Sequence, residues 1–333
     1  MPWKSSQSVS PQRRSGWRGT DFGPGGAWPA RAPYAFTYSE ATETRAPPQQ
    51  ISSAIRNWLI QSAGSHHWHG LRGSDGMTGH RIGVGRRGIG SASEPDLHFY
   101  FDPVCQFTWL TSKWVRQVVA ARKYTVEWRL ISLRIVNDHI DYDTHFPPAY
   151  KASHYAGLRM LRVAARARTE LGQPAVDALQ ASFGEHIFEI PPWPDERERS
   201  DTVGSPAHVA RILAAAGLPP ELAEALDDTS WDTEIQAETF QALALTGTDV
   251  GTPILHFDPP DGVAIFGPVI SRMPSPPEAV ELWDHVTALA RFGGFAELKR
   301  SSRERPQLPV FGTPAGQVGM LEDWHQGQPS GAA

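Results

Sequence analysis

The sequence predicts an α/β protein in which a long helical segment is inserted between two groups of strands. The first observation is a strand–helix–strand unit. An apolar, aromatic run at Leu97–Phe101 indicates a short buried strand, which Asp102-Pro103 ends. Apolar residues at helical spacing predict a helix over about 106–122, and the alternating stretch Tyr124–Leu133 predicts a second strand. We expect these two strands to be parallel and joined by a right-handed crossover.

The second observation is a return to strand pattern near the end of the chain. Pro253 opens an apolar run that ends at Phe257, and 263–266 reads as its hairpin partner. A final amphipathic helix is predicted over about 277–292. Between the two groups, residues 149–248 show helical spacing almost throughout, so the predicted order is β-α-β, helical insert, β-β-α.

Domain boundaries follow from this order. We expect one domain built from residues 96–148 and 249–300, a helical domain over 149–248, and a flexible tail over 301–333 that is rich in Pro and Gly. Within the insert, helices are predicted to end near Gly172, Gly217 and Gly247, and the charged stretch 191–201 is predicted to be a loop.

Cys105 is the only cysteine among 333 residues, and it stands where the first strand turns into the first helix. A helix N-terminus carries partial positive charge, so we expect the pKa of this thiol to be lowered and the thiol to be reactive. The alternative is that Cys105 is simply a small buried hydrophobe. A single cysteine excludes an intramolecular disulfide and implies no oxidising compartment.

Charge is unevenly distributed. The net charge is −5 overall, +7 over residues 1–92 and −12 over residues 93–333. The acidic main body argues against a nucleic-acid partner. Residues 1–92 are rich in Gly, Pro, Ser and Arg and are expected to be a disordered extension, with Met77 as an alternative native start. We find no apolar run long enough to cross a membrane and no signal peptide, and we expect a cytoplasmic protein.

Two motifs in the first 92 residues lack the surrounding sequence that a binding site would need. Gly83–Gly88 matches G-x-G-x-x-G, but neither a strand before it nor a helix after it is predicted. His66, His67 and His69 have no carboxylate or cysteine nearby to complete a metal site. We therefore expect no metal and no dinucleotide.

Three local stretches give the chain a resemblance to a known family. They are Phe99–Thr108 around the cysteine, Val250–Pro253, and Phe266–Pro268 with the closing helix. With the helical insert they make the chain similar to the DsbA-like branch of the thioredoxin superfamily, over about residues 96–300. It most resembles the actinobacterial proteins that include the mycothiol-dependent nitroreductases. This resemblance implies a thioredoxin fold with an inserted helical domain, and a cis peptide bond before Pro253.

The chain departs from that family at one position. Cys105-Gln-Phe-Thr108 has threonine where the family's Cys-x-x-Cys motif has its second cysteine. With one cysteine, the chain cannot cycle between a dithiol and its own disulfide. What remains is attack by the thiolate, a mixed disulfide, and release by an external thiol. The implied cofactor is a low-molecular-weight thiol, mycothiol or similar.

The candidate site residues follow from the same comparison. Cys105 is the predicted nucleophile, and the Thr108 hydroxyl, one helical turn on, is expected to stabilise its thiolate. The predicted thiol- and substrate-binding residues are Phe107, Asn137, Thr252 and Pro253. Core packing is the alternative for Phe107, a plain turn for Asn137, and an ordinary strand-opening proline for Pro253.

The sequence thus predicts a thiol-dependent, DsbA-like oxidoreductase that acts with one cysteine on a small-molecule or disulfide substrate. Its partners would be a small thiol and that substrate. One alternative is an enzyme like the kappa-type glutathione transferases or isomerases, which activate a thiol without forming a disulfide. Another is a redox-inactive thioredoxin-fold binding protein.

Overall fold

The computed structural model describes residues 94–145, 148–300, 302–313 and 321–323. The predictions made for residues 1–92 lie outside this range: the disordered extension, Met77 as a start, the glycine motif and the histidine cluster.

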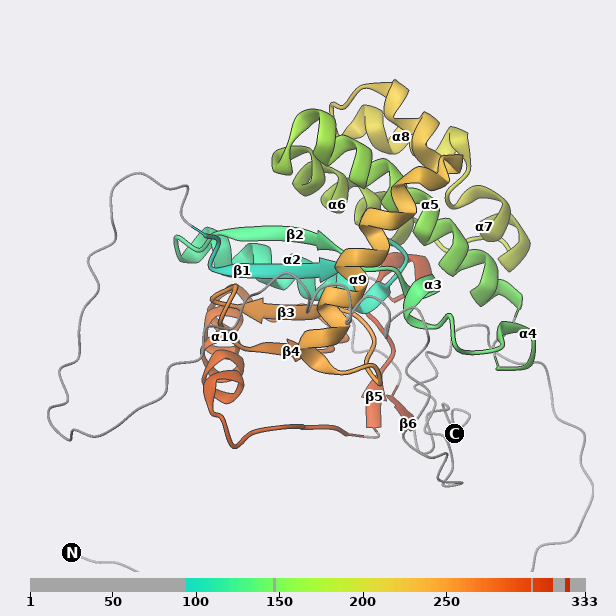
Figure 1. The fold of residues 1–333 in the computed structure, drawn as a ribbon. Coiled ribbons are helices and arrows are strands. Elements are labelled where there is room, and N and C mark those ends of the chain that lie inside the picture. The colour runs from blue at the N-terminus through green and yellow to red at the C-terminus, as the bar shows by residue number, and fades with distance from the viewer. Residues whose placement is uncertain (1–93, 146–147, 301, 314–320, 324–333) are drawn as a thin grey trace, which may run out of the picture. The chain divides into compact units, whose positions relative to one another are not determined.

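Four strands form the sheet on which the rest of the described chain packs (Figure 1). They are β1 (Leu97–Phe101), β2 (Val126–Leu130), β3 (Ile254–Phe257) and β4 (Ala264–Phe266). The spatial order is β2-β1-β3-β4: β1 and β2 are parallel, β3 is antiparallel to β1, and β4 is antiparallel to β3. This order and these directions are those of a thioredoxin fold, which confirms the predicted fold class.

Strand alternation separates two buried faces of the sheet. Leu97, Phe99 and Phe101 belong to the main hydrophobic cluster, which includes residues of α2 (Gln106–Ala121) and α10 (Pro276–Arg291). Tyr100 instead packs in a second cluster with Phe240 and Leu243 of α9 (Asp232–Thr246). Helices therefore cover both faces, and α9 lies in front of the sheet in Figure 1.

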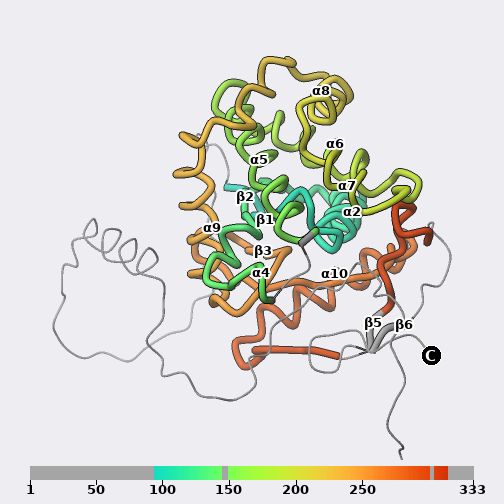
Figure 2. The backbone as a smooth tube through the Cα atoms, turned by 90° about the vertical axis from the view of Figure 1, so that its right-hand side faces the viewer, coloured from blue at the N-terminus to red at the C-terminus, as the bar shows by residue number. Residues whose placement is uncertain are grey.

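The inserted segment is a group of helices that share the main hydrophobic cluster with the sheet. Figures 1 and 2 both show α5, α6 and α8 grouped together. Its elements are α5 (Pro148–Leu171), α6 (Gln173–Phe188), α7 (Glu196–Thr202), α8 (Pro206–Ala215), the 3₁₀ helices η1 (Pro220–Asp227) and η2 (Thr229–Trp231), and α9. Because Met160 and Leu213 of the insert belong to the same buried cluster as Phe99 and Trp114, the insert does not have a separate core.

Helix α9 also closes the open edge of the sheet. The Glu238 carboxylate accepts a hydrogen bond from the Leu130 amide at 2.7 Å, and Thr239 Oγ1 accepts one from the Ser132 amide at 3.1 Å. Arg168 of α5 and Arg129 of β2 both pair with Glu238 at 2.9 Å. An edge strand with free amides is exposed to unwanted pairing, and α9 satisfies the amide at the end of β2 and one just beyond it.

Two local predictions were wrong. The strand predicted over Tyr124–Leu133 ends at Leu130, and two short helices follow it, α3 (Leu133–Val136) and α4 (Tyr142–His145). The predicted loop 191–201 contains most of α7. Helix α7 has no buried residue, so its sequence carries no apolar stripe, and Asp195 caps its first turn instead.

Part of the predicted flexible tail is packed. Residues 302–313 contain β5 (Ser302–Glu304), paired with β6 (Leu321–Asp323), and the 3₁₀ helix η3 (Pro309–Phe311). Leu308 is fully buried in the main cluster, so this segment is part of the hydrophobic core.

Candidate active site

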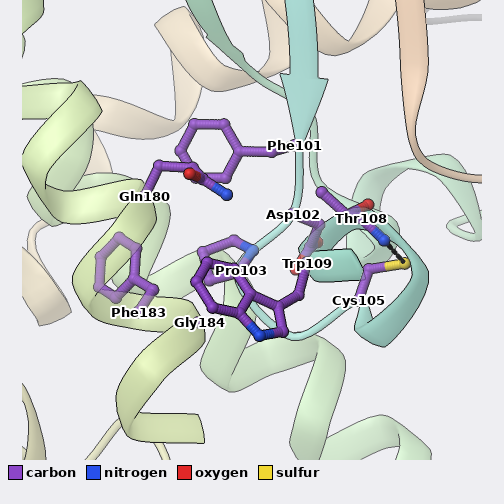
Figure 3. Close-up of a pocket in the computed structure, with 9 residues that line it drawn as sticks. All are labelled: Phe101, Asp102, Pro103, Cys105, Thr108, Trp109, Gln180, Phe183 and Gly184. Carbon is purple, nitrogen blue, oxygen red and sulfur yellow. Dashed lines mark hydrogen bonds between the residues drawn. The ribbon is translucent and has the colours of Figure 1, made fainter. Parts of the chain in front are cut away.

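Cys105 is the N-cap residue of α2, and its sulfur lies between two backbone groups. Sγ accepts a hydrogen bond from the Thr108 amide at 3.4 Å, drawn as a dashed line in Figure 3. It also lies 3.6 Å from the carbonyl oxygen of Thr252, to which the thiol donates. The Thr252–Pro253 bond is cis and leads directly into β3. The fold thus brings together two stretches that are 147 positions apart in the chain.

The thiol is fully buried, and this reverses one expectation. Burial raises the pKa of Cys105 above its ordinary value, and hydrogen bonding by Thr108 and Thr252 opposes that rise only in part. The predicted lowering of the pKa by the helix N-terminus is therefore wrong for this closed arrangement. The S–H donation to Thr252 likewise fits a neutral thiol at rest.

A buried carboxylate stands three residues before the thiol. Asp102 Oδ1 accepts a hydrogen bond from the Val104 amide at 2.9 Å, and Oδ2 accepts one from the Leu133 amide at 2.7 Å. Asp102 is 1% exposed, and burial raises its pKa to about 7 despite these two bonds. Its negative charge also contributes to the raised pKa of Cys105.

Leu133 joins several of the predicted site residues. Its side chain packs against Cys105 and Phe107, and its amide donates to Asp102. Its carbonyl oxygen accepts hydrogen bonds from Asn137 Nδ2 at 2.9 Å and from the Tyr142 hydroxyl at 3.4 Å. Asn137 therefore ends α3 and helps to fix Leu133, whose side chain packs against Cys105 and Phe107.

The insert reaches the site through α6. Gly184 lets the ring of Trp109 lie directly against the α6 backbone, since a Cβ there would overlap the ring. Trp109 Nε1 donates to Glu189 Oε1 at 2.8 Å, and Lys113 Nζ pairs with the same oxygen at 2.6 Å. This contact fixes the first turn of α2, and therefore Cys105, relative to the insert.

A small cavity lies between this first turn and α6, as Figure 3 shows. Its lining residues are Phe101, Asp102, Pro103, Cys105, Thr108, Trp109, Gln180, Phe183 and Gly184. Asp102 and Cys105 are the titratable side chains in this lining. The Thr108 side chain is buried, and its hydrogen bonding to the thiol acts with that of its amide to lower the pKa of Cys105.

The structure places three of the predicted site residues around the Cys105 sulfur: Phe107, Thr108 and Thr252, with Pro253 next in the chain. Asn137 is linked to them through Leu133 and does not line the cavity. Asp102, Leu133 and Trp109 were missed as site residues. A carboxylate immediately after a buried strand and before the helix is the signal that could have identified Asp102.

Comparison with known proteins places this site in a family. The model of the Rv2466c-like family, described as mycothiol-dependent nitroreductase Rv2466c, matches residues 104–300, which is more than half of the chain. The chain belongs to this family. It is therefore a member of a thiol-dependent oxidoreductase family, with threonine at position 108.

A curated relative and two solved structures are also similar. Uncharacterized protein Rv2286c of Mycobacterium tuberculosis is 29% identical over 205 residues, covering 61% of this chain and 81% of the relative. A putative protein-disulfide isomerase from Pseudomonas syringae is 19% identical with a TM-score of 0.35, covering 56% of this chain and 90% of that one. The probable DsbA oxidoreductase SCO1869 from Streptomyces coelicolor is 14% identical with a TM-score of 0.39, covering 65% and 98%.

Within the described ranges, no set of three or more His, Cys, Asp and Glu side chains is placed to hold a metal ion. In the same part of the chain, no helix is both long and apolar enough to span a bilayer.

Proposed function

We propose that this protein is a monothiol oxidoreductase in which Cys105 exchanges disulfides with a low-molecular-weight thiol of the mycothiol type. The observation that carries the proposal is the position of Cys105 Sγ at the N-cap of α2, 3.6 Å from the carbonyl before Pro253. The chain has no second cysteine, so each exchange must involve an external thiol.

The residues around Cys105 are chemically suited to reaction with a small thiol. The Thr108 amide already donates to the sulfur and would also stabilise a thiolate there. No other cysteine competes for the mixed disulfide. Because Cys105 is fully buried, Phe107 or Leu133 has to move aside before another sulfur reaches it. When bound, the thiol supplies the electrons, two thiols becoming one disulfide.

The exchange uses the Cys105 sulfur alone. The Cys105 thiolate attacks a sulfur of the substrate disulfide, the S–S bond breaks, and one half leaves as a thiol while the other stays bonded to Cys105. Cys105 is regained as a thiolate when an external thiol breaks that mixed bond. The first external thiol is then bonded to the substrate half, and a second external thiol breaks this bond. Two thiols are therefore oxidised to one disulfide for each substrate disulfide reduced.

The other candidate residues have supporting roles in this proposal. Thr252 and Pro253 would present a backbone edge to the bound molecule, and Phe107 would form the lip of the opened site. Asn137 would act by holding Leu133, whose side chain packs against Cys105. The partners would be the small thiol and a small substrate in the cytoplasm, without nucleic acid or membrane.

A redox-inactive binding protein is the second candidate, and one observation favours it. The buried, neutral thiol with a raised pKa is what a structural cysteine would show. A kappa-type transferase is a third, because it needs no second cysteine. The two enzyme candidates differ in whether a mixed disulfide forms on Cys105.

The test measures reduction of bis(2-hydroxyethyl) disulfide and of a nitroaromatic by mycothiol, using the full chain. We expect activity that is lost in Cys105→Ser. A matched control adds Ser205→Cys to that variant, because Ser205 is also a helix N-cap whose side chain accepts from an amide one turn on. This double variant should stay inactive, since its new cysteine does not lie beside Thr252-Pro253. Full activity in Cys105→Ser would reject the proposal.

A further inference from the structure

Two histidines face each other on the sheet, outside the cavity beside Cys105. His98 of β1 lies directly opposite His256 of β3 in the antiparallel pair, and the two strands run side by side in Figure 1. The centroids of the two rings are 5.7 Å apart. A histidine nitrogen bound to a metal ion at about 2.0–2.1 Å puts its ring centroid roughly 3 Å from the ion, so two rings on one ion have centroids about 5–6 Å apart. The histidine pair has this separation.

The ring nitrogens of this pair are buried and incompletely hydrogen-bonded. His98 Nδ1 is buried and has no hydrogen-bond partner among the described residues. His256 is 3% exposed, and the Gly262 backbone is the one hydrogen-bond partner of its ring within the described ranges, so at least one of its two nitrogens is left unpaired there. A buried polar atom without a partner is costly, so two of them on facing side chains point to a bound group that satisfies both.

A carboxylate on β2 favours a free lone pair on His98 Nδ1. Glu127 lies opposite His98 in the parallel pair, and its Oε2 is 3.9 Å from His98 Nε2. This negative charge favours the proton on Nε2, which leaves Nδ1 as the nitrogen with the lone pair. The nearby positive charge of Arg129 is balanced by its ion pairs with Glu127 and Glu238. Burial lowers the pKa of His98 to about 4 and also lowers the pKa of His256, so both rings are neutral at neutral pH, the form that binds a metal ion.

We propose that His98 and His256 together bind one divalent transition-metal ion such as Zn²⁺, which bridges β1 and β3. Neutral imidazole is a preferred ligand of these ions. Because no third His, Cys, Asp or Glu side chain within the described ranges joins the pair, water fills the remaining coordination positions. Glu127 orients His98 without binding the ion. The ion would join the two strands whose other ends adjoin Cys105 and Thr252-Pro253.

The test is calorimetric titration of the full chain with ZnCl₂ after treatment with EDTA. MgCl₂ is the control ion and should not bind at this site, because Mg²⁺ prefers oxygen ligands. We expect a Zn²⁺ site that is lost in His98→Gln and in His256→Gln, and whose affinity falls about 10-fold in Glu127→Gln. His285→Gln is the matched control: this histidine also lies near a carboxylate, 3.7 Å from Glu281, but is on the surface of α10, and its loss should leave the affinity unchanged.

Zn²⁺ binding elsewhere, or no binding at all, overturns the proposal. An ion held by Cys105 or by the histidines within 66–69 would stay bound in both His98→Gln and His256→Gln. Should those variants not fold, X-ray absorption tests the same site in a Zn²⁺-loaded chain whose histidines within 66–69 are replaced by Gln. Its spectrum should show two imidazole ligands and no sulfur, and a sulfur ligand or the absence of imidazole would contradict the bridge between β1 and β3. The titration uses no thiol cofactor, so loss of the proposed enzyme activity would not affect this test.

Discussion

Replacing Gly184 with alanine tests whether the insert fixes the position of Cys105. The added Cβ would overlap Cε3, Cδ2 and Cζ3 of the Trp109 ring. The ring is 5% exposed, and its Nε1–H is bonded to Glu189 at 2.8 Å, so it cannot turn away without losing that bond. Overpacking of this kind costs about 1–3 kcal/mol, and we expect Gly184→Ala to lower the free energy of unfolding by about 3 kcal/mol.

The assay is urea unfolding of the full chain, followed by far-ultraviolet circular dichroism so that tryptophan signals do not enter. Gly293→Ala is the control, because a Cβ there meets nothing within 4 Å, and its effect should be within about 0.5 kcal/mol. Trp109→Leu should partly rescue Gly184→Ala, since a smaller side chain leaves room for the new methyl group. Additive effects in this double-mutant cycle, or no destabilisation by Gly184→Ala, would refute the assignment of this contact.

Three further predictions follow from other parts of the structure. Thr108→Cys should form an internal disulfide with Cys105 on oxidation, because residue 108 is one helical turn from the sulfur; intact mass should show the loss of two hydrogens, and two free thiols would contradict this. Glu238→Gln should lower the free energy of unfolding by about 3 kcal/mol, since it breaks buried ion pairs with two arginines. Glu234→Gln, at a more exposed ion pair, should lower it by less than about 1 kcal/mol. Equal effects in urea unfolding would contradict the assigned role of Glu238 at the edge of the sheet. Burial lowers the pKa of His154 and of His208 from 6.5 to about 4, so the unfolded chain binds more protons than the folded chain between these pH values. The free energy of unfolding should therefore fall by about 1.4 kcal/mol per pH unit for each histidine as the pH is lowered through this window. His208→Gln should flatten this dependence as measured by urea unfolding.

Much of the fold could be predicted because its signals are local. The aromatic run Leu97–Phe101 and the apolar spacing after Cys105 determine a strand and a helix by periodicity alone. Helix α7 was missed because all of its face is exposed or half-buried, so no apolar stripe marks it. The packing of Leu308 was missed because it depends on contacts with distant elements that no local pattern records.

The sequence pointed to Cys105 and the two stretches beside it, but not to Asp102, Leu133 and Trp109 and not to the electrostatics of the site. The Cys105, Thr108 and Pro253 positions followed from short motifs, and the structure brings these motifs together. The burial of the sulfur depends on Leu133 and Thr252, from two other parts of the chain. The helix N-terminus alone predicts a lowered thiol pKa, but desolvation outweighs it here. The same burial gives Asp102 a proton affinity close to neutral pH.

The most direct test of the central claim is the intact mass of the full chain during turnover with mycothiol and a small disulfide. The account predicts one adduct per chain, a substrate half bonded to Cys105, which is absent in Cys105→Ser and removed by excess mycothiol. A chain that stays unmodified while the substrate is reduced would contradict it, because Cys105 would then act without forming a mixed disulfide.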